Sequence, residues 1–193
     1  FSFVSRIDVD QLILQRLPTT LAVIGLSQLL AILVALPVGI LAAARPYSWF
    51  DRIASTLAFV GFSLPTFFTG VVFILFFSIY LGWFPFVYRS DLSETGLAWW
   101  WQQFRQSIMP ITVLGLFQAA SMMRYVRSAV LDVLREDFVR TARAKGLSRR
   151  AVLWGHVLRN AMVPVLTVMG LQFANLVTGT IVVENVFSLP GLG

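Results

Sequence analysis

Long stretches without a single charged residue constrain this chain more than any other feature. Residues 19–44 form an uncharged run of 26, residues 53–88 a run of 36, and residues 160–183 a run of 24. A helix of about 20 apolar residues crosses the ~30 Å hydrocarbon core of a bilayer. Composition agrees, because only 12% of the residues are charged, against roughly 25% in soluble domains. The sequence predicts an all-α membrane protein, a polytopic bundle of transmembrane helices.

Four membrane spans are expected, at about residues 19–44, 53–81, 108–130 and 160–183. Residues 1–17 are mildly amphipathic and suit a helix on the membrane surface, with Pro18 at the start of the first span. Pro65 removes a backbone hydrogen bond, so the pieces before and after SLPTF are expected to be separate half-helices. The third span is expected to continue as a helix past Arg124 and Arg127 into the charged segment that follows.

A basic segment separates the last two spans and decides the orientation of the chain. Residues 135–160 carry seven of the fifteen Lys and Arg residues. Residues 124–159 hold nine basic and three acidic residues, whereas residues 86–107 hold two of each. Because Lys and Arg accumulate in cytoplasmic loops, residues 135–159 are predicted to be a cytoplasmic loop. Four spans then leave both chain ends outside, which indicates that an upstream span is missing from this sequence.

The basic segment has the pattern of a helix, a glycine turn and a second helix. Apolar residues recur at spacings of three and four and predict one apolar face, at Leu131, Leu134, Phe138 and Ala142. Gly146 is placed to end the first helix in a left-handed conformation. Ser148 can then cap the second helix through its hydroxyl group.

The charges of this segment also follow helical spacing. Two pairs have the acid first, which is the favourable order on an exposed helix: Asp132 with Arg135, and Glu136 with Arg140. Arg149 and Arg150 lie in the first turn of the second helix, where the helix dipole disfavours basic residues. Their position indicates either an outside partner for the segment or simply the cytoplasmic side of the membrane.

Residues for catalysis or cofactor binding are not recognised. The chain has no cysteine, no Gly-rich phosphate loop of the form GxxxxGK[ST], and no nucleophile paired with a base. The single histidine, His156, has no acidic neighbour close in sequence and suits a packing or surface role. We therefore expect no catalytic residue, no metal site, no cofactor and no enzymatic activity in this chain.

Some residues inside or beside the predicted spans have two interpretations. Trp99, Trp100 and Trp101 suit an aromatic anchor at the membrane interface, or else a platform that contacts a substrate. Glu184 is either a helix-end residue or a substrate or gating contact. Polar residues inside a span usually face other helices or a water-filled path. The candidate translocation-path or gate residues are Pro65, Asn175 and Glu184.

Two other functional classes share some of these patterns. A helix, a glycine turn and a basic helix are also typical of a DNA reader. Here the second helix runs into an apolar span through Pro164, so no nucleic-acid partner is expected. A passive channel or a membrane scaffold is the main alternative. A channel would be expected to show a repeated pore-lining pattern or a ring of charge, and neither is visible in the sequence.

Several motifs in a fixed order resemble one family of membrane proteins. They are RLPTTL at 16–21, GFSLPTFFTG at 61–70, LGWFP at 81–85, DFVRTARAKGLSRRAVLWGHVLRNAMVPVLTVMGLQF at 137–173 and VVENVFSLPGLG at 182–193. Together they resemble binding-protein-dependent ABC importer permeases, most closely the dipeptide/oligopeptide/nickel subfamily. The general family loop is EAA, three residues, then Gly. Here Arg140, Thr141 and Ala142 occupy the EAA positions, and RTA is what the peptide/nickel subgroup tends to show.

The resemblance implies a fold, a location and a set of partners. It implies a partial type I importer permease fold in a bacterial or archaeal inner membrane, lacking the first and last of six spans. The partners would be a second permease subunit, with a heterodimer expected, two cytoplasmic ATP-binding subunits and an extracytoplasmic solute-binding protein. The solute would be a short peptide, a nickel chelate or a glutathione-like molecule. The implied ATPase-coupling residues are Arg140, Thr141, Ala142, Ala144, Lys145, Gly146, Leu147 and Ser148.

Overall fold

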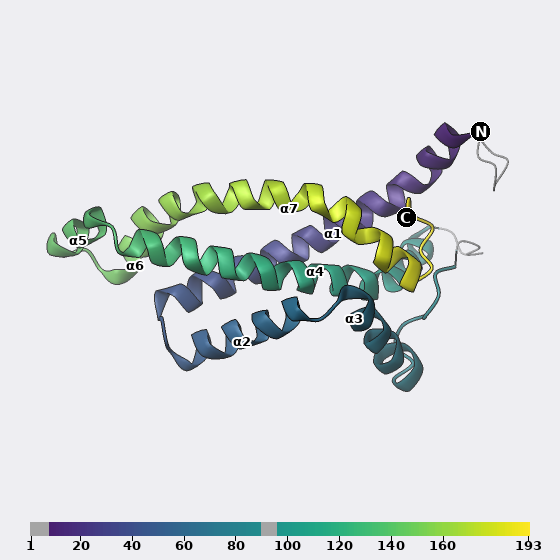
Figure 1. The fold of residues 1–193 in the computed structure, drawn as a ribbon, viewed down its shortest axis with the longest axis horizontal. Coiled ribbons are helices and arrows are strands. Elements are labelled where there is room, and N and C mark those ends of the chain that lie inside the picture. Colours follow the sequence, from purple (N-terminus) through teal and green to yellow (C-terminus); the bar gives the residue numbers. More distant parts are fainter. Residues whose placement is uncertain (1–7, 90–95) are drawn as a thin grey trace. The chain divides into compact units, whose positions relative to one another are not determined.

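A computed structural model describes residues 8–89 and 96–193, without the side chains of residues 173–179. The described residues form helices and no strand, which confirms the predicted all-α class (Figure 1). The helices are α1 (Val9–Ala44), α2 (Trp49–Ser63), α3 (Thr66–Phe73), the π-helix η1 (Ile74–Tyr80), α4 (Leu97–Leu134), α5 (Asp137–Ala144), α6 (Arg149–Val152), the π-helix η2 (Leu153–Val157) and α7 (Leu158–Val186).

Three helical stretches of the described residues are long and apolar enough to cross a membrane. They are Val9–Ala44, Leu97–Leu134 and Arg149–Gln172. A fourth passes the same test only if Trp49–Ser63 and Thr66–Tyr80 are taken together as one broken span. The break falls at Leu64 and Pro65, so the half-helices predicted around SLPTF are present. The limits of the lipid-crossing parts within these helices stay a prediction.

The chain divides into two compact units. Unit 1 contains residues 1–30, 64–115 and 175–193, and unit 2 contains residues 31–63 and 116–174. In unit 1, buried residues of α1, α4 and α7 such as Val23, Val113 and Val183 form one apolar cluster. In unit 2, a second cluster contains buried residues of α1, α2, α4, α5 and α7. Each unit is described separately below.

Helix limits differ from the sequence expectation at two N-termini. α1 begins at Val9, so Pro18 lies inside a helix and not at its start. Asp10 in the first turn favours the earlier start, because an acid there opposes the positive end of the helix dipole. α4 begins at Leu97, directly after the left-handed Gly96, and not near residue 108. The three tryptophans therefore lie on a helix.

Unit 2 is packed closely where α1 and α4 meet. A Cβ atom added at Gly39 of α1 would lie 2.8 Å from both Cβ and Cγ1 of Val126, and 3.0 Å from the carbonyl oxygen of Met123. Gly61 of α2 is nearly as close to α4, because a Cβ there would lie 3.4 Å from the Cβ of Ala120. Small residues that let helix backbones approach are typical of helix association in membranes.

The close approach at Gly39 can be tested with a single methyl group. We expect Gly39→Ala to destabilise the folded protein by about 1–3 kcal/mol, because well-packed sites tolerate added volume poorly. Gly25→Ala on the same helix is the matched control, since a Cβ there meets nothing within 4 Å. Thermal unfolding of the detergent-solubilised variants measures the difference. Equal unfolding temperatures for the two variants would contradict the packing described.

Candidate functional site

The basic segment folds as two short helices joined by a glycine turn. Gly146 has a φ of +84°, the left-handed conformation predicted for it. Its N–H donates to the carbonyl of Arg143 (2.9 Å), and the N–H of Leu147 donates to the carbonyl of Ala142 (3.3 Å). These two bonds form a complete Schellman motif at the end of α5. The Ser148 hydroxyl accepts the N–H of Ala151 and caps α6, as predicted.

α5 is not a continuation of α4. The helix α4 passes Arg124 and Arg127 as predicted but ends at Leu134, and Glu136 has an extended backbone before α5 begins. This break changes the helical phase, so the apolar face predicted from Leu131 to Ala142 is wrong at Phe138, which is 40% exposed. It also changes the ion pairing, because Arg140 pairs with Asp137 (3.3 Å) within α5.

One face of α5 packs against the apolar cluster of unit 2. Val139 and Ala142 are 0% and 7% exposed, and they belong to the same apolar cluster as Val126 and Val130 of α4 and Val152 of α6. Of the eight residues predicted for ATPase coupling, Ala142 is therefore buried. The others lie exposed on α5, on the turn or at the start of α6: Arg140, Thr141, Ala144, Lys145, Gly146, Leu147 and Ser148.

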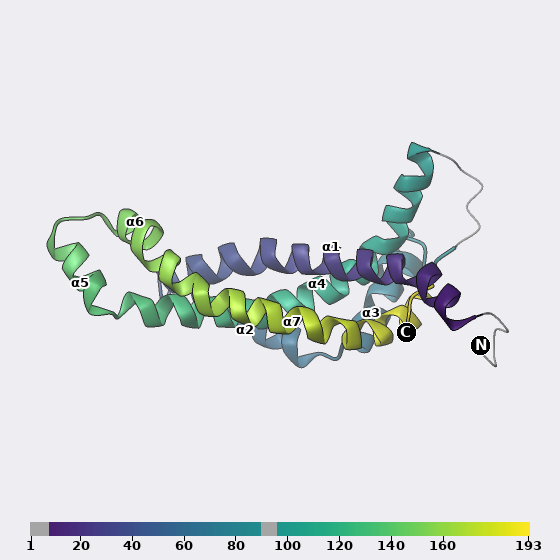
Figure 2. The same cartoon turned by 90° about the horizontal axis from the view of Figure 1, so that it is seen from above.

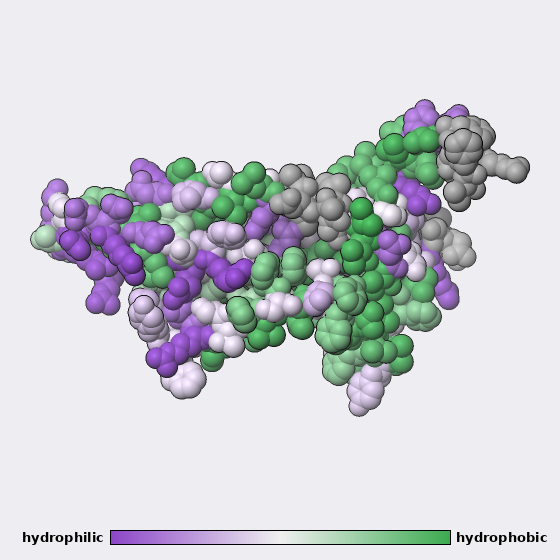
Figure 3. Space-filling view, viewed as in Figure 1, coloured by the Kyte–Doolittle hydropathy of each residue, from purple (hydrophilic) through white to green (hydrophobic). Residues whose placement is uncertain are grey.

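The exposed face of this helix–turn–helix, residues 137–154, is called the coupling surface below. α5 and α6 lie together next to the end of α4 (Figures 1 and 2), and hydrophilic residues gather over them (Figure 3). Five exposed basic residues belong to it: Arg140, Arg143, Lys145, Arg149 and Arg150. Trp154, 62% exposed, lines a hollow of about 430 Å³ with Ser148, Arg150 and Ala151. Exposed Trp and Arg side chains are typical of protein–protein contact sites.

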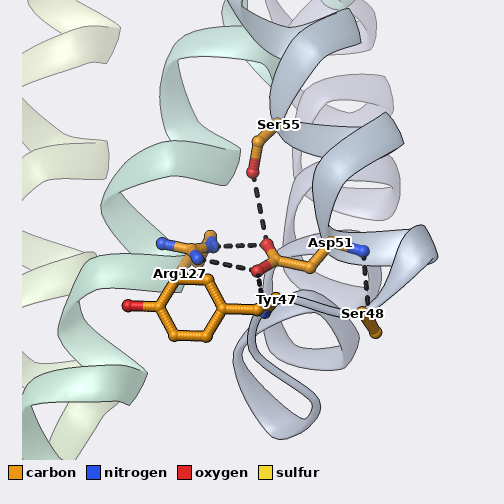
Figure 4. Close-up of polar contacts among 5 residues, drawn as sticks. All are labelled: Tyr47, Ser48, Asp51, Ser55 and Arg127. Atoms are coloured by element: carbon orange, nitrogen blue, oxygen red, sulfur yellow. Dashed lines mark hydrogen bonds and ion pairs between the residues drawn. The ribbon is translucent and has the colours of Figure 1, made fainter.

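An ion pair between a buried carboxylate and a partly exposed guanidinium group lies in the same unit. Asp51, in the first turn of α2, is 2% exposed, and its carboxylate accepts two hydrogen bonds from Arg127 of α4 (Figure 4). The distances are 2.6 Å from Nε to Oδ1 and 2.8 Å from Nη2 to Oδ2. The same carboxylate accepts the N–H of Tyr47 (2.8 Å) and the hydroxyl of Ser55 (3.2 Å). Removing Arg127 would leave the buried carboxylate without its charged partner, which is destabilising.

Glu184, a candidate gate residue, is buried in unit 1 with only 2% of its surface exposed. Its carboxylate accepts the hydroxyl of Thr20 on α1 (2.6 Å) and the N–H of Gly193 (2.7 Å). The Thr20 hydroxyl in turn accepts the N–H of Leu192 (3.0 Å). A Cβ at Gly191 would lie 2.1 Å from the Glu184 carboxyl carbon. These contacts hold the backbone of residues 187–193 against α1 and α7.

Pro65, a second candidate gate residue, makes no described contact with this network. Pro65 is exposed at the N-terminus of α3, where its carbonyl accepts the N–H and the hydroxyl of Thr69. Asn175 lies in α7, but its side chain is outside the described residues. Trp99 and Trp100 line a hollow of about 450 Å³ beside α1, and Trp101 lines another of about 650 Å³. An anchor and a substrate platform both remain predictions for them.

Residues 35–193 match the family model of the binding-protein-dependent transport system inner membrane component. The chain belongs to this family. The match covers nearly all of unit 2, the coupling surface and Glu184, whereas Thr20 lies before it. It agrees with the resemblance seen in the sequence motifs and with an inner-membrane location for a chain that has long apolar helices.

Curated relatives within the family carry names that refer to transport. The chain is 41% identical over 96% of its length to the oligopeptide transport system permease protein AppB of Bacillus subtilis. It is 44% identical over its whole length to the glutathione transport system permease protein GsiC of Salmonella choleraesuis, and 40% identical to a putative peptide transport system permease protein of Brucella abortus. The chain spans 58–60% of the length of these inner-membrane components.

Sequence reasoning missed two polar contacts of this family member. The sequence patterns assign no partner to Asp51, Arg127 or Thr20. A signal existed for Arg127, since a charged residue within an apolar helix usually has a charged or polar partner. The partner itself lies 76 positions away along the chain and could not be named from the sequence.

The Thr20 hydroxyl can be removed without changing side-chain shape. We expect Thr20→Val to cost about 1–3 kcal/mol, because Glu184 loses a donor and the N–H of Leu192 loses its acceptor. Hydrogen exchange of residues 187–193 should become faster, whereas Thr20→Ser should preserve the protection. Thr19→Val is the neighbouring control. Unchanged exchange in Thr20→Val would show that the hydroxyl does not hold this segment.

Proposed function

We propose that this chain is a permease subunit of an ATP-driven importer and forms part of a path for short peptides or a related small solute. The observation that carries the proposal is the coupling surface, which is exposed and basic on one side and packed on the core of unit 2 on the other. A partner that pushes on this surface can therefore displace the packed helices behind it. Family membership and the names of the relatives support the same function.

The proposed partners are those that membership of this family implies. The sequence itself has no phosphate loop. ATP hydrolysis is assigned to two cytoplasmic subunits, one of which contacts residues 140–148. A second permease subunit completes the path, and an extracytoplasmic binding protein delivers the solute. Oligopeptides and glutathione, named for the relatives, share an amide backbone and free carboxylates, and this class of solute is proposed here.

Mechanical coupling on this proposal depends on packing. Because α4 and α5 are separated by an extended residue, α5 does not act as a rigid extension of α4. Val139 and Ala142 instead transmit displacement of the coupling surface to the side chains of α4 and α6 that they contact. Interdigitated side chains pass on strain because protein interiors are close-packed. Two conformations of unit 2 would then differ in how well they fit the nucleotide-bound partner.

The function is tested by reconstituting the full transporter in proteoliposomes with its co-purified subunits. We expect ATP-dependent uptake of a labelled oligopeptide or of glutathione, and stimulation of ATP hydrolysis by the loaded binding protein. Solute flux without ATP would instead favour a passive channel. Failure of an ATP-binding subunit to co-purify would favour a membrane scaffold, and either result would overturn the proposal.

Gly146 gives a sharper test of the coupling surface. Apart from its neighbours in sequence, no atom of this chain lies within 4 Å of a Cβ placed at Gly146, so within the chain a substitution there acts through the positive φ. A left-handed conformation costs an ordinary L-residue roughly 1–2 kcal/mol, whereas Asn adopts it more readily. We expect Gly146→Val to lower uptake by about 5–30-fold with ATPase stimulation reduced in parallel, and Gly146→Asn to retain most of both. Fully coupled transport by Gly146→Val would contradict the role assigned to this turn.

A further inference from the structure

The pair of Asp51 and Arg127 occupies a particular place between the coupling surface and α2. Arg127 lies two helical turns before the end of α4 at Leu134, and α5 follows after the break. Asp51 lies in the first turn of α2, next to the short connection from α1. The pair therefore connects the C-terminal end of α4, which precedes α5, with the first turn of α2. The other end of α2 lies at the break that contains Pro65.

Hydrogen bonds from several donors fix the position of the Asp51 carboxylate. It accepts four hydrogen bonds, two from Arg127, one from the N–H of Tyr47 and one from the Ser55 hydroxyl (Figure 4). Tyr47 has a φ of +62°, an uncommon conformation for a non-glycine residue, and its N–H points at this carboxylate. The N–H of Asp51 donates to the Ser48 hydroxyl (3.2 Å), which caps the helix. A bidentate arginine–carboxylate pair adds a fixed relative orientation to these contacts.

The other end of α2 also contacts α4. The guanidinium group of Arg124 lies 4.4 Å from the centre of the Phe62 ring, and that ring stacks on Phe117 at 5.5 Å. Next to Phe62, Gly61 would place a Cβ 3.4 Å from the Cβ of Ala120 on α4. α2 thus contacts α4 near both of its ends, by an ion pair at its first turn and by aromatic and small-residue contacts near its last.

From this arrangement we infer that Asp51 and Arg127 are positioning residues that make α2 move together with the end of α4 when the coupling surface is displaced. This inference rests on the proposed transport function. Without the ion pair, only aromatic and apolar packing holds α2 on α4, and a displacement of α4 reaches the Ser63–Pro65 connection incompletely. The pair would therefore set how much solute is carried for each ATP hydrolysed, without contacting solute or nucleotide.

Charge exchange tests the pair in the reconstituted full transporter. In Asp51→Asn and in Arg127→Gln we expect uptake per ATP hydrolysed to fall about 5-fold or more, within the usual range of coupling between sites. The exchanged double variant Asp51→Arg with Arg127→Asp should recover uptake per ATP beyond either single variant. Arg52→Gln, an exposed neighbour of Asp51, is the control and should behave as wild type. Normal coupling in both single variants would overturn the inference.

A disulfide provides a second test that does not depend on the charges. The chain contains no cysteine, and the 3.4 Å between a Cβ at Gly61 and that of Ala120 is close to the ~3.5–4.5 Å of a disulfide. Gly61→Cys with Ala120→Cys, oxidised in the Asp51→Asn background, should restore uptake per ATP, and reduction should reverse the gain. Loss of transport on oxidation in the otherwise unchanged protein would show that α2 and α4 separate, and would overturn the inference.

The outcomes also separate this inference from the proposed function. If the unchanged transporter shows no ATP-dependent uptake, the proposed function fails and the pair has no coupling role. If it transports normally and the exchanged and cross-linked variants show no rescue, only the inference fails. Size-exclusion profiles of the solubilised variants identify a single variant that does not fold, and the oxidised cysteine variant without charge changes then supplies the deciding measurement.

Discussion

A buried carboxyl group needs hydrogen-bond partners, and this requirement organises both units of the protein. In unit 2 the carboxylate of Asp51 is satisfied by Arg127, Tyr47 and Ser55. In unit 1 the carboxylate of Glu184 is satisfied by the hydroxyl of Thr20 and the N–H of Gly193. Because a buried polar group without hydrogen-bond partners is costly, each acid fixes the elements that supply its donors. The first fixes the α1–α2 connection against α4, and the second fixes residues 187–193.

The coupling surface depends on unit 2 in the same way. Its helix α5 is too short to be stable alone, since isolated helices below about 12–15 residues are marginal in water. Burial of Val139 and Ala142, the Schellman motif at Gly146 and the Ser148 cap supply the missing stability. The coupling surface therefore has a defined shape, and its charged residues are exposed where a partner could contact them. α5 is attached to α4 by side-chain packing and not by a continuous helix. For this reason we give the Asp51–Arg127 pair a role in coupling.

Local chemistry was predictable from the sequence, and distant contacts were not. The Gly146 turn and the Ser148 cap were predicted because such signals act within a few residues. The all-α class followed from the uncharged runs, and the family resemblance followed from motifs in a fixed order. Phe138 was assigned to the wrong face because the periodicity was continued through a break that no proline or glycine marks. The Thr20–Glu184 bond joins residues 164 positions apart, and only the folded chain shows that they meet.

The central claim is that the exposed side of α5 and the turn after it contact an ATP-binding subunit. Single cysteines can be placed without background in this chain, so cross-linking of the assembled transporter tests the contact directly. Ala144 is exposed and Ala142 is buried on the same helix. We expect Ala144→Cys to form a cross-link to the ATP-binding subunit with a short bifunctional maleimide, and Ala142→Cys to form little. A co-purified ATP-binding subunit that cross-links to neither position, or equally to both, would contradict the account.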